Sequence, residues 1–309
     1  ALFVMLMYYF MYQYTKLNFY RTGVRKTLFP LAMSGLFFGI GVAVKWQGVY
    51  AGVGLCVLFF WTLFKRFSEF MAAKDGRLVG NSEEIIRQFV PNAFKTLAAA
   101  VLFFVVIPFC IYFLSYLPII LSDAADVRYF WENQQTMLRY HSQLTETHPY
   151  GSPWWSWPLD MRPLYAYNPN WDFVKETQAQ GISSFGNPLV WWLTIPSLGY
   201  LLYLAVKGRR SAETYTILVG FGALYLPWML ISRQAFIYHF FPCVIFVTLA
   251  IAYCLREILI QYPKATLFVR AYFLCVLLLY VVFYPVLTGI RIPAWYAEAL
   301  SWLPGWVLG

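Results

Sequence analysis

Eight apolar segments dominate the sequence and determine which class of fold it can adopt. Hydrophobic residues make up 61% of the 309 residues and charged residues only 12%, whereas soluble domains carry about 25% charged residues. Apolar runs of this length are typical of helices that cross a bilayer. We therefore predict an all-α fold, a polytopic helical membrane protein with about eight transmembrane helices. The segments cover residues 1–14, 28–44, 49–64, 96–121, 187–206, 214–231, 236–255 and 268–288.

The first apolar segment is too short to span a membrane. Residues 1–14 fall below the roughly 20 residues that a transmembrane helix needs. A signal peptide would begin with a basic stretch, and the sequence has none before this segment. We expect a truncated first helix and a chain that is the C-terminal part of a longer protein.

Basic residues alternate between successive connections. By the positive-inside rule, the more basic connections lie in the cytoplasm. These include a mixed-charge loop at 65–95, expected to be a solvated or interfacial linker. The alternation predicts three regions: transmembrane helices in 1–121, an extracytoplasmic loop at 122–186, and transmembrane helices with an external C-terminal tail in 187–309. Because the cations follow membrane topology, the net charge of +9 does not indicate nucleic-acid binding.

Small and sulfur-containing residues within the apolar segments fit helix packing. The spacings Gly35-xxx-Gly39 and Gly48-xxx-Gly52 allow two helices to approach closely. The five cysteines all lie in apolar segments and lack metal-ligand spacing, so packing is their expected role. The sequence therefore predicts no metal site and no bound cofactor.

The loop at 122–186 is unusually rich in aromatic residues for a membrane protein connection. Helical periodicity over 126–147 places Phe130, Met137, His141 and Leu144 on one face, which predicts a helix lying on the outer membrane surface. The following segment, 148–158, is too rich in Pro and Gly for a continuous helix. A loop of this size suggests a catalytic or ligand-binding face.

Two cations stand out because each follows a span in a very short turn at the expected outer boundary. Lys45 ends one apolar segment, and Arg233 lies between two others. A lipid-linked phosphate would lie at that depth, and Arg suits bidentate phosphate contact. The alternative is that both side chains are snorkelling anchors. His239, just inside the next span, is a further candidate for phosphate binding or a packing histidine.

Aromatic and histidine side chains of the loop are candidates for substrate contact. The tryptophans near Pro153 and Pro158 could stack on sugar faces or form an interfacial aromatic belt. The two loop histidines could bind substrate or brace the loop. We find no convincing acid–base pair, so the loop carboxylates are expected to be solvated charges. The substrate and loop candidates are His141, His148, Tyr150, Trp154, Trp155, Trp157 and Arg162.

Three segments carry a resemblance to the protein O-mannosyltransferase family. Residues 41–50, with Lys45-Trp46 and Gly48, resemble its Lys-Trp motif, and residues 233–242 are similar to a late-helix motif. The extracytoplasmic loop motif is similar to Arg139-Tyr-His141, His148-Pro-Tyr150, Ser152, Trp154-Trp155, Trp157-Pro158 and Arg162-Pro163. The likeness extends over most of the chain from about Gly23.

The resemblance implies a GT-C fold and transfer of mannose, with inversion, from a polyprenyl phosphate to Ser or Thr hydroxyls of secreted or membrane proteins. The loop is too short for the additional domain of eukaryotic members, which implies a bacterial-type enzyme. The family's acidic catalytic motif precedes the region seen here, so we expect no catalytic base in this chain and no activity from it alone. The resemblance allows for a dimer, although the sequence carries no interface signature.

Other functions remain open at this point. A GT-C transferase acting on a lipid or glycan would use the same phosphate-binding residues. A transporter of polyprenyl-linked sugar would place ionisable residues at mid-membrane, whereas most here lie at segment ends. A non-catalytic membrane protein is the third alternative.

Overall fold

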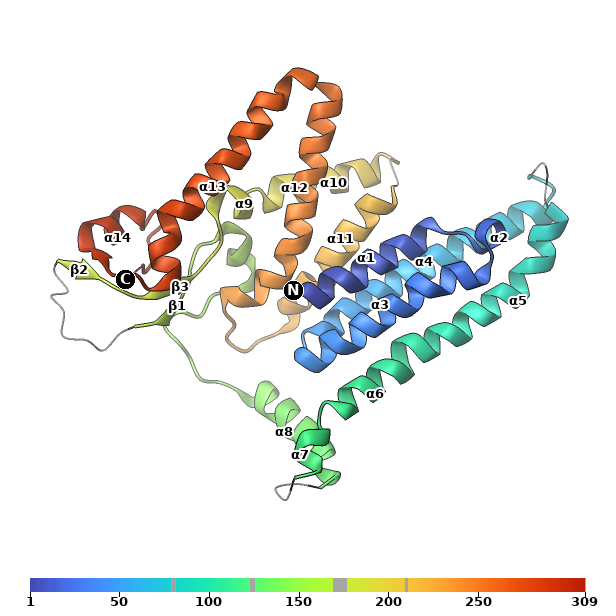
Figure 1. The fold of residues 1–309 in the computed structure, drawn as a ribbon, viewed down its shortest axis with the longest axis horizontal. Helices are drawn as coiled ribbons and strands as arrows, with labels where there is room; N and C mark the ends of the chain where they lie inside the picture. The colour runs from blue at the N-terminus through green and yellow to red at the C-terminus, as the bar shows by residue number, and fades with distance from the viewer. Residues whose placement is uncertain (79, 81, 123–125, 169–176, 209–210, 309) are drawn as a thin grey trace. The chain divides into compact units, whose positions relative to one another are not determined.

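The computed structural model describes residues 1–78, 80, 82–122, 126–168, 177–208 and 211–308, and it divides into two compact units. The first unit comprises Ala1–Tyr140 and Leu204–Pro227, and the second comprises His141–Tyr203 and Trp228–Gly309 (Figure 1).

The first unit is built from helices. Close contacts between α1 and α3 and between α4 and α11 form its centre. Its elements are α1 (Leu2–Lys16), α2 (Phe19–Thr22), α3 (Val24–Val44), α4 (Gly48–Lys74), α5 (Ser82–Val101), the π-helical segment η1 (Leu102–Val106), α6 (Ile107–Leu114), α7 (Leu117–Ile120), α8 (Arg128–Gln143) and α11 (Ala212–Tyr225).

Glycines allow the helices of the first unit to pack at short distance. A methyl group at Gly35 would overlap the backbone of Phe103. One at Gly39 would lie 2.8 Å from the Cα atom of Pro108. Both positions therefore confirm the close approach expected from the first of the two small-residue spacings.

Arg66 corrects the expectation of a solvated loop at 65–95. Helix α4 continues to Lys74 and α5 begins at Ser82, so most of that stretch is helical. The Arg66 side chain is 1% exposed. Its guanidinium donates to the hydroxyl of Tyr14 at 2.8 Å and to the carbonyl of Leu17 at 3.0 Å. It also lies 4.6 Å and 4.7 Å from the ring centroids of Tyr14 and Phe19, so it is a core residue.

Helix α8 matches the helix predicted from periodicity over 126–147. Phe130 is buried against the rings of Phe109, Phe113 and Tyr116, at centroid distances of 6.2, 5.2 and 5.1 Å. The amide of Gln134 donates to the Tyr116 hydroxyl at 3.0 Å. An aromatic cage and polar contacts therefore attach α8 to the end of α6.

The second unit combines helices with two small antiparallel sheets that the sequence did not predict. Strand β1 pairs with β3, and β2 pairs with β4. The elements are η2 (Trp154–Leu159), β1 (Leu164–Tyr167), β2 (Gln178–Ala179), β3 (Ile182–Ser184), α9 (Pro188–Trp191), α10 (Thr194–Val206), η3 (Leu226–Leu230), η4 (Ile237–Phe240), α12 (Phe241–Gln261), η5 (Pro263–Ala265), α13 (Thr266–Thr288), β4 (Ile292–Pro293) and α14 (Ala294–Leu300).

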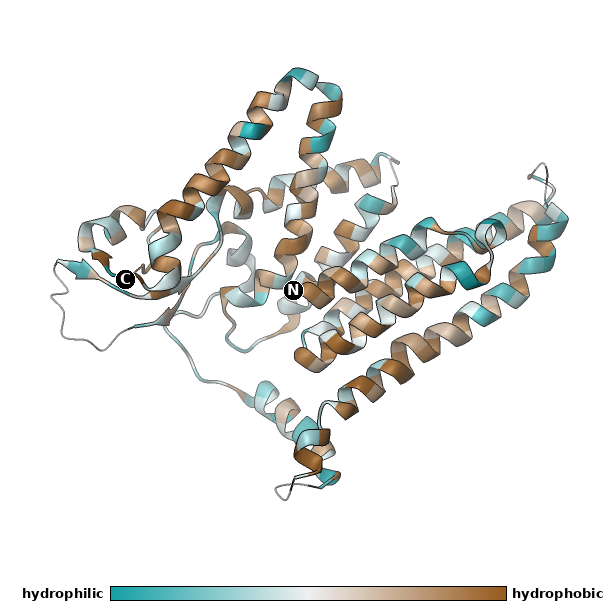
Figure 2. Cartoon of the chain, viewed as in Figure 1, coloured by the Kyte–Doolittle hydropathy of each residue, from teal (hydrophilic) through white to brown (hydrophobic). Residues whose placement is uncertain are grey.

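Six helical segments in the described part of the chain are long and apolar enough to cross a membrane. All eight predicted apolar segments form helices, but α1 and α11 have only 15 and 14 residues, so a count of eight spans is not confirmed. Figure 2 shows hydrophobic residues along α3, α4, α12 and α13, with hydrophilic residues at the turn between α12 and α13. The six segments are Val24–Val44, Gly48–Lys74, Ser82–Leu114, Pro188–Val206, Ile237–Gln261 and Pro263–Thr288.

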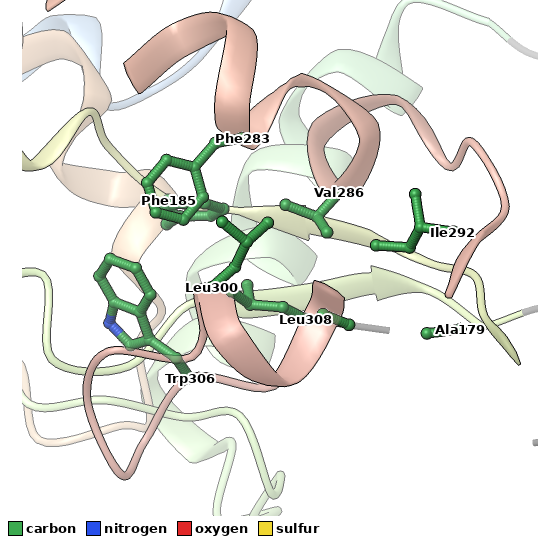
Figure 3. Close-up of a cluster of buried hydrophobic side chains, with 9 residues drawn as sticks. Ala179, Phe185, Phe283, Val286, Ile292, Leu300, Trp306 and Leu308 are labelled. Carbon is green, nitrogen blue, oxygen red and sulfur yellow. The ribbon is translucent and has the colours of Figure 1, made fainter. Parts of the chain in front are cut away.

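A buried hydrophobic cluster joins the aromatic loop to the C-terminal part of the second unit (Figure 3). Phe283 and Val286 of α13 meet Phe185, which follows β3, and Leu300 of α14. Trp306 is 4% exposed and lies with its ring centroid 5.0 Å from that of Phe185. Residues 289–309, expected to be a tail, thus include a strand, a helix and part of the core.

Candidate functional site

The turn containing Arg233 is hydrogen-bonded to the aromatic loop. The Gln234 side chain accepts a hydrogen bond from the backbone N–H of His148 and donates to the His148 carbonyl at 2.8 Å. The backbone N–H of Ser152 donates to the carbonyl of Ala235 at 2.9 Å. Three hydrogen bonds therefore join two motifs that are far apart in the sequence.

Gly151 makes this close contact feasible. A methyl group at Gly151 would overlap the Gln234 side chain. Only glycine leaves room for that amide to reach both backbone groups of His148. Gln234 and Gly151 were not among the predicted site residues, because their importance depends on this nonlocal contact.

Arg233 lines a cavity of about 280 Å³ formed by residues 151–154, 231–235 and Trp228. Among the described residues, no carboxylate lies within ion-pair distance of its guanidinium. Partial burial and the charge of Arg233 lower the pKa of the His141 imidazole, so this ring stays neutral near pH 7. The site thus offers a cation and neutral polar groups, a combination suited to an anion.

His148, which contacts Gln234, has a defined orientation. Its Nδ1 atom accepts the backbone N–H of Tyr150 at 3.2 Å, and its ring meets Phe236 edge-on at 5.3 Å. The Nδ1 contact favours the tautomer with the proton on Nε2. His148 can therefore donate one hydrogen bond to a ligand.

His239 and Trp157 are buried, and their predicted contacts with phosphate and substrate stay predictions. Trp157 has no exposed surface and donates from Nε1 to Ser152 Oγ at 3.0 Å. His239 is 3% exposed, with its ring 4.2 Å from Trp228 and 6.1 Å from Trp157. Both side chains pack inside the second unit.

The other predicted loop residues are more accessible. Trp154 lines the Arg233 cavity, and Trp155 is 53% exposed. Trp155 and the exposed Arg162 line a separate, mostly apolar cavity of about 710 Å³. A face for stacking on substrate is therefore open at Trp154 and Trp155 alone among the three tryptophans.

Lys45 belongs to the first unit. It is exposed where α3 ends, and the neighbouring Trp46 donates from its indole to the Tyr112 hydroxyl at 2.7 Å. Because Lys45 and Arg233 lie in different units, their joint contact with one phosphate stays a prediction.

Asp160 is the polar residue that sequence reasoning misjudged most. It was expected to be a solvated loop charge, yet its side chain is fully buried. Oδ2 accepts the backbone N–H of Gly186 at 3.1 Å, and the Asp160 carbonyl accepts the Trp306 indole at 2.6 Å. Burial raises the pKa of this carboxyl to about 8.

The structure describes four of the remaining acids of the loop and tail. Asp126, Glu132, Glu146 and Glu298 are exposed, while Asp123, Asp172 and Glu176 lie outside the described residues. The described residues contain no group of three or more His, Cys, Asp or Glu side chains that could hold a metal ion.

Comparison with protein families accounts for nearly the whole chain. Residues 1–121 match the model described as dolichyl-phosphate-mannose-protein mannosyltransferase. Residues 127–306, more than half of the chain, match the C-terminal four-transmembrane region of protein-O-mannosyltransferase. The chain belongs to the protein O-mannosyltransferase family. It is a multi-span, helical membrane protein, as expected from its sequence.

Relatives with curated names include the polyprenol-phosphate-mannose–protein mannosyltransferases of two bacteria. The Mycolicibacterium smegmatis protein is 30% identical over 93% of this chain and 59% of its own length. The Corynebacterium glutamicum protein is 26% identical over 88% of this chain and 57% of its own. The chain thus spans somewhat more than half the length of these protein O-mannosyltransferases.

A eukaryotic member of the family also matches. It is a chain in the solved structure of the Saccharomyces cerevisiae protein O-mannosyltransferase Pmt1–Pmt2 complex bound to the sugar donor. The match covers 60% of the present chain and 27% of the yeast chain. Identity is 21% and the TM-score is 0.49.

Proposed function

We propose that the protein containing this chain transfers mannose from a polyprenyl phosphate to Ser or Thr hydroxyls of proteins, with inversion, outside the cytoplasm. Family membership and the names of its relatives support the reaction type. The observation that carries the proposal is Arg233, a cation without a carboxylate partner among the described residues. It lines a cavity together with Gln234, which is hydrogen-bonded to His148. A lipid phosphate has the charge and size to occupy it.

In the proposed reaction, a carboxylate base takes the proton from the acceptor hydroxyl while that oxygen attacks the anomeric carbon of mannose. The bond between this carbon and the phosphate oxygen breaks, and its electron pair stays on the lipid phosphate. Arg233 stabilises the charge that grows on the leaving phosphate, a large term in many enzymes. His148 donates a hydrogen bond from Nε2 to the same group.

The described carboxylates of this site do not supply the base. Asp160 is buried and holds Gly186, so its place is structural. We propose that the base comes from the family's acidic motif outside this chain, and that cationic side chains stabilise the phosphate without a metal ion. Addition of EDTA to an active preparation should then leave the rate unchanged.

Orientation and pairing are also proposals. The distribution of basic residues over the connections supports a position outside the cytoplasm for the loop at 122–186 and for the C-terminus. Labelling of a single cysteine introduced at Ser142 by an impermeant reagent would test the loop. Pairing of two chains follows only from the family resemblance. The mass of the detergent-solubilised protein would test it.

The first experiment uses membranes containing the full-length gene product, polyprenyl-phosphate-mannose and a Ser/Thr-rich peptide. Arg233→Ala should reduce mannose transfer by about 100-fold, because it removes the cation that faces the leaving phosphate. The matched control is Arg270→Ala, an exposed cation on α13, which should stay within about twofold of wild type. Equal rates in both variants would show that Arg233 has no role in the mechanism. Mannose found only on a lipid or glycan would show that the acceptor is not a protein.

A further inference from the structure

A second polar cavity adjoins the Arg233 site within the same unit. It measures about 530 Å³, within the range of ligand pockets in proteins. Tyr150 lines this cavity, and the next residue, Gly151, lines the Arg233 cavity. A single loop segment thus forms a wall of each. The two cavities are therefore lined by adjacent residues of one loop segment.

The hydrophobic cluster of Figure 3 supports the base of this cavity. Ala179, Trp306 and Leu308 belong both to the cluster and to the cavity lining. All three are less than 9% exposed. Because the cluster is buried, the cavity has a firm base, which lowers the ordering cost of binding.

The upper walls carry groups suited to a neutral or cationic polar chain. The rings of Tyr150 and Tyr165 lie 5.8 Å apart and meet at 54°, and Gln178 and Ser301 contribute an amide and a hydroxyl. Among the described residues that line the cavity, Glu298 alone is charged. Its carboxylate is exposed, so it would attract a cation and repel an anion in the cavity.

We propose that this cavity binds the part of the acceptor polypeptide that flanks the modified hydroxyl, and that Glu298 favours a basic flanking residue. The inference rests on the proposed function for its substrate. An extended peptide carries the backbone amides and hydroxyl side chains that match the amide, hydroxyl and tyrosine groups of the walls. A neutral sugar chain also carries hydroxyls, but it has no positive charge for the Glu298 carboxylate to attract.

The test measures peptide binding without the sugar donor, so that it does not depend on turnover. Labelled Ser/Thr peptides with flanking Lys, Gln or Glu are titrated against the purified full-length protein, and fluorescence anisotropy gives the Kd. Each exposed charge contact changes affinity a few-fold, so attraction and repulsion together predict about tenfold tighter binding of the Lys peptide than of the Glu peptide. Glu298→Gln should reduce this ratio to about one to two.

Two further variants distinguish the effect of the Glu298 charge from the effect of the cavity volume. Ser301→Tyr fills the cavity from an exposed position, so it should weaken all three peptides alike and raise KM without lowering kcat. The matched control is Glu132→Gln, an exposed carboxylate on α8, which should leave the ratio at about tenfold. In 0.5 M salt the wild-type ratio should shrink, because exposed charges are screened.

The results separate the two proposals. The subsite is overturned if no peptide binds, if Glu298→Gln keeps the tenfold ratio, or if Ser301→Tyr abolishes binding of a mannose oligosaccharide and leaves peptide binding unchanged. Peptide binding with the predicted ratio supports the subsite. If that binding occurs without any mannose transfer from the lipid donor, the proposed function fails while the peptide site stands.

Discussion

The carboxamide of Gln234 binds both backbone groups of His148, a residue 86 positions earlier in the chain. One side chain thereby fixes the distance between the turn that carries Arg233 and the loop that carries Tyr150. Phosphate and acceptor groups in the proposed reaction are aligned by this contact, and small misplacements of aligned groups reduce rates strongly.

Gly151→Ala should destabilise the second unit by about 2 kcal/mol, because the new methyl group displaces Gln234 and breaks two hydrogen bonds. Thermal unfolding in detergent should shift down by several degrees, and mannose transfer should fall. The matched control is Gly199→Ala on α10. Its methyl group would meet no atom within 4 Å, so the melting temperature should not fall.

A double-mutant cycle gives a sharper prediction for the same contact. In a Gln234→Ala background the clashing side chain is gone, so Gly151→Ala should cost less than half as much as in the wild type. The coupling is read from four melting temperatures. Fully additive costs would show that the Gly151 methyl acts on something other than Gln234.

Stability should fall as pH rises, through Asp160. Its folded pKa of about 8 lies above the ordinary value of 3.8, so the folded state binds the extra proton between these limits. The stabilisation is complete below about pH 4 and is lost as pH rises through about 8, by up to about 1 kcal/mol per pH unit. Asp160→Asn removes the titration and should flatten this slope in melting curves at pH 5 to 9. An unchanged slope would assign the titration to another group.

Helix α8 should detach locally when its anchor is removed. Phe130→Ala deletes a ring that is 2% exposed, a change that costs about 3–5 kcal/mol in well-packed sites. Limited proteolysis should cut near α8 sooner, while the membrane helices stay protected. Leu138→Ala on the same helix, at a side chain 64% exposed, is the control and should leave the cleavage rate near that of wild type.

Arg66→Lys should reduce the melting temperature by several degrees. A lysine cannot reach both the Tyr14 hydroxyl and the Leu17 carbonyl in fork geometry, and it loses the stacking on Tyr14 and Phe19. Arg25→Lys, at an exposed arginine, should change it little. Equal melting temperatures for wild type and Arg66→Lys would mean that the buried fork contributes no net stability.

Local patterns in the sequence were enough to predict the helices. The periodicity over 126–147 predicted α8 (Arg128–Gln143) because the helical repeat of apolar residues can be recognised within that segment alone. The strands were missed because they are two to four residues long and depend on partners elsewhere in the chain. Pairing of β2 with β4, for example, joins Ala179 to Ile292.

Burial separated residues that look alike in the sequence. Trp155 and Trp157 are two positions apart in one Pro-rich turn, yet one is 53% exposed and the other fully buried. Asp160 and Glu298 are both loop or tail acids, yet only Glu298 reaches solvent. Such differences arise from tertiary packing, here around Trp306 and Trp228, which no local pattern encodes.

In the proposed orientation, the buried guanidinium of Arg66 matters at two different times. Before folding, Arg66 would count among the basic residues that orient an emerging chain in the bilayer. After the helices assemble, the same charge is enclosed by Tyr14, Leu17 and Phe19. A substitution that keeps the positive charge can therefore leave membrane insertion intact and still prevent packing of the helices. Defects in insertion and defects in packing would then be observed at different steps.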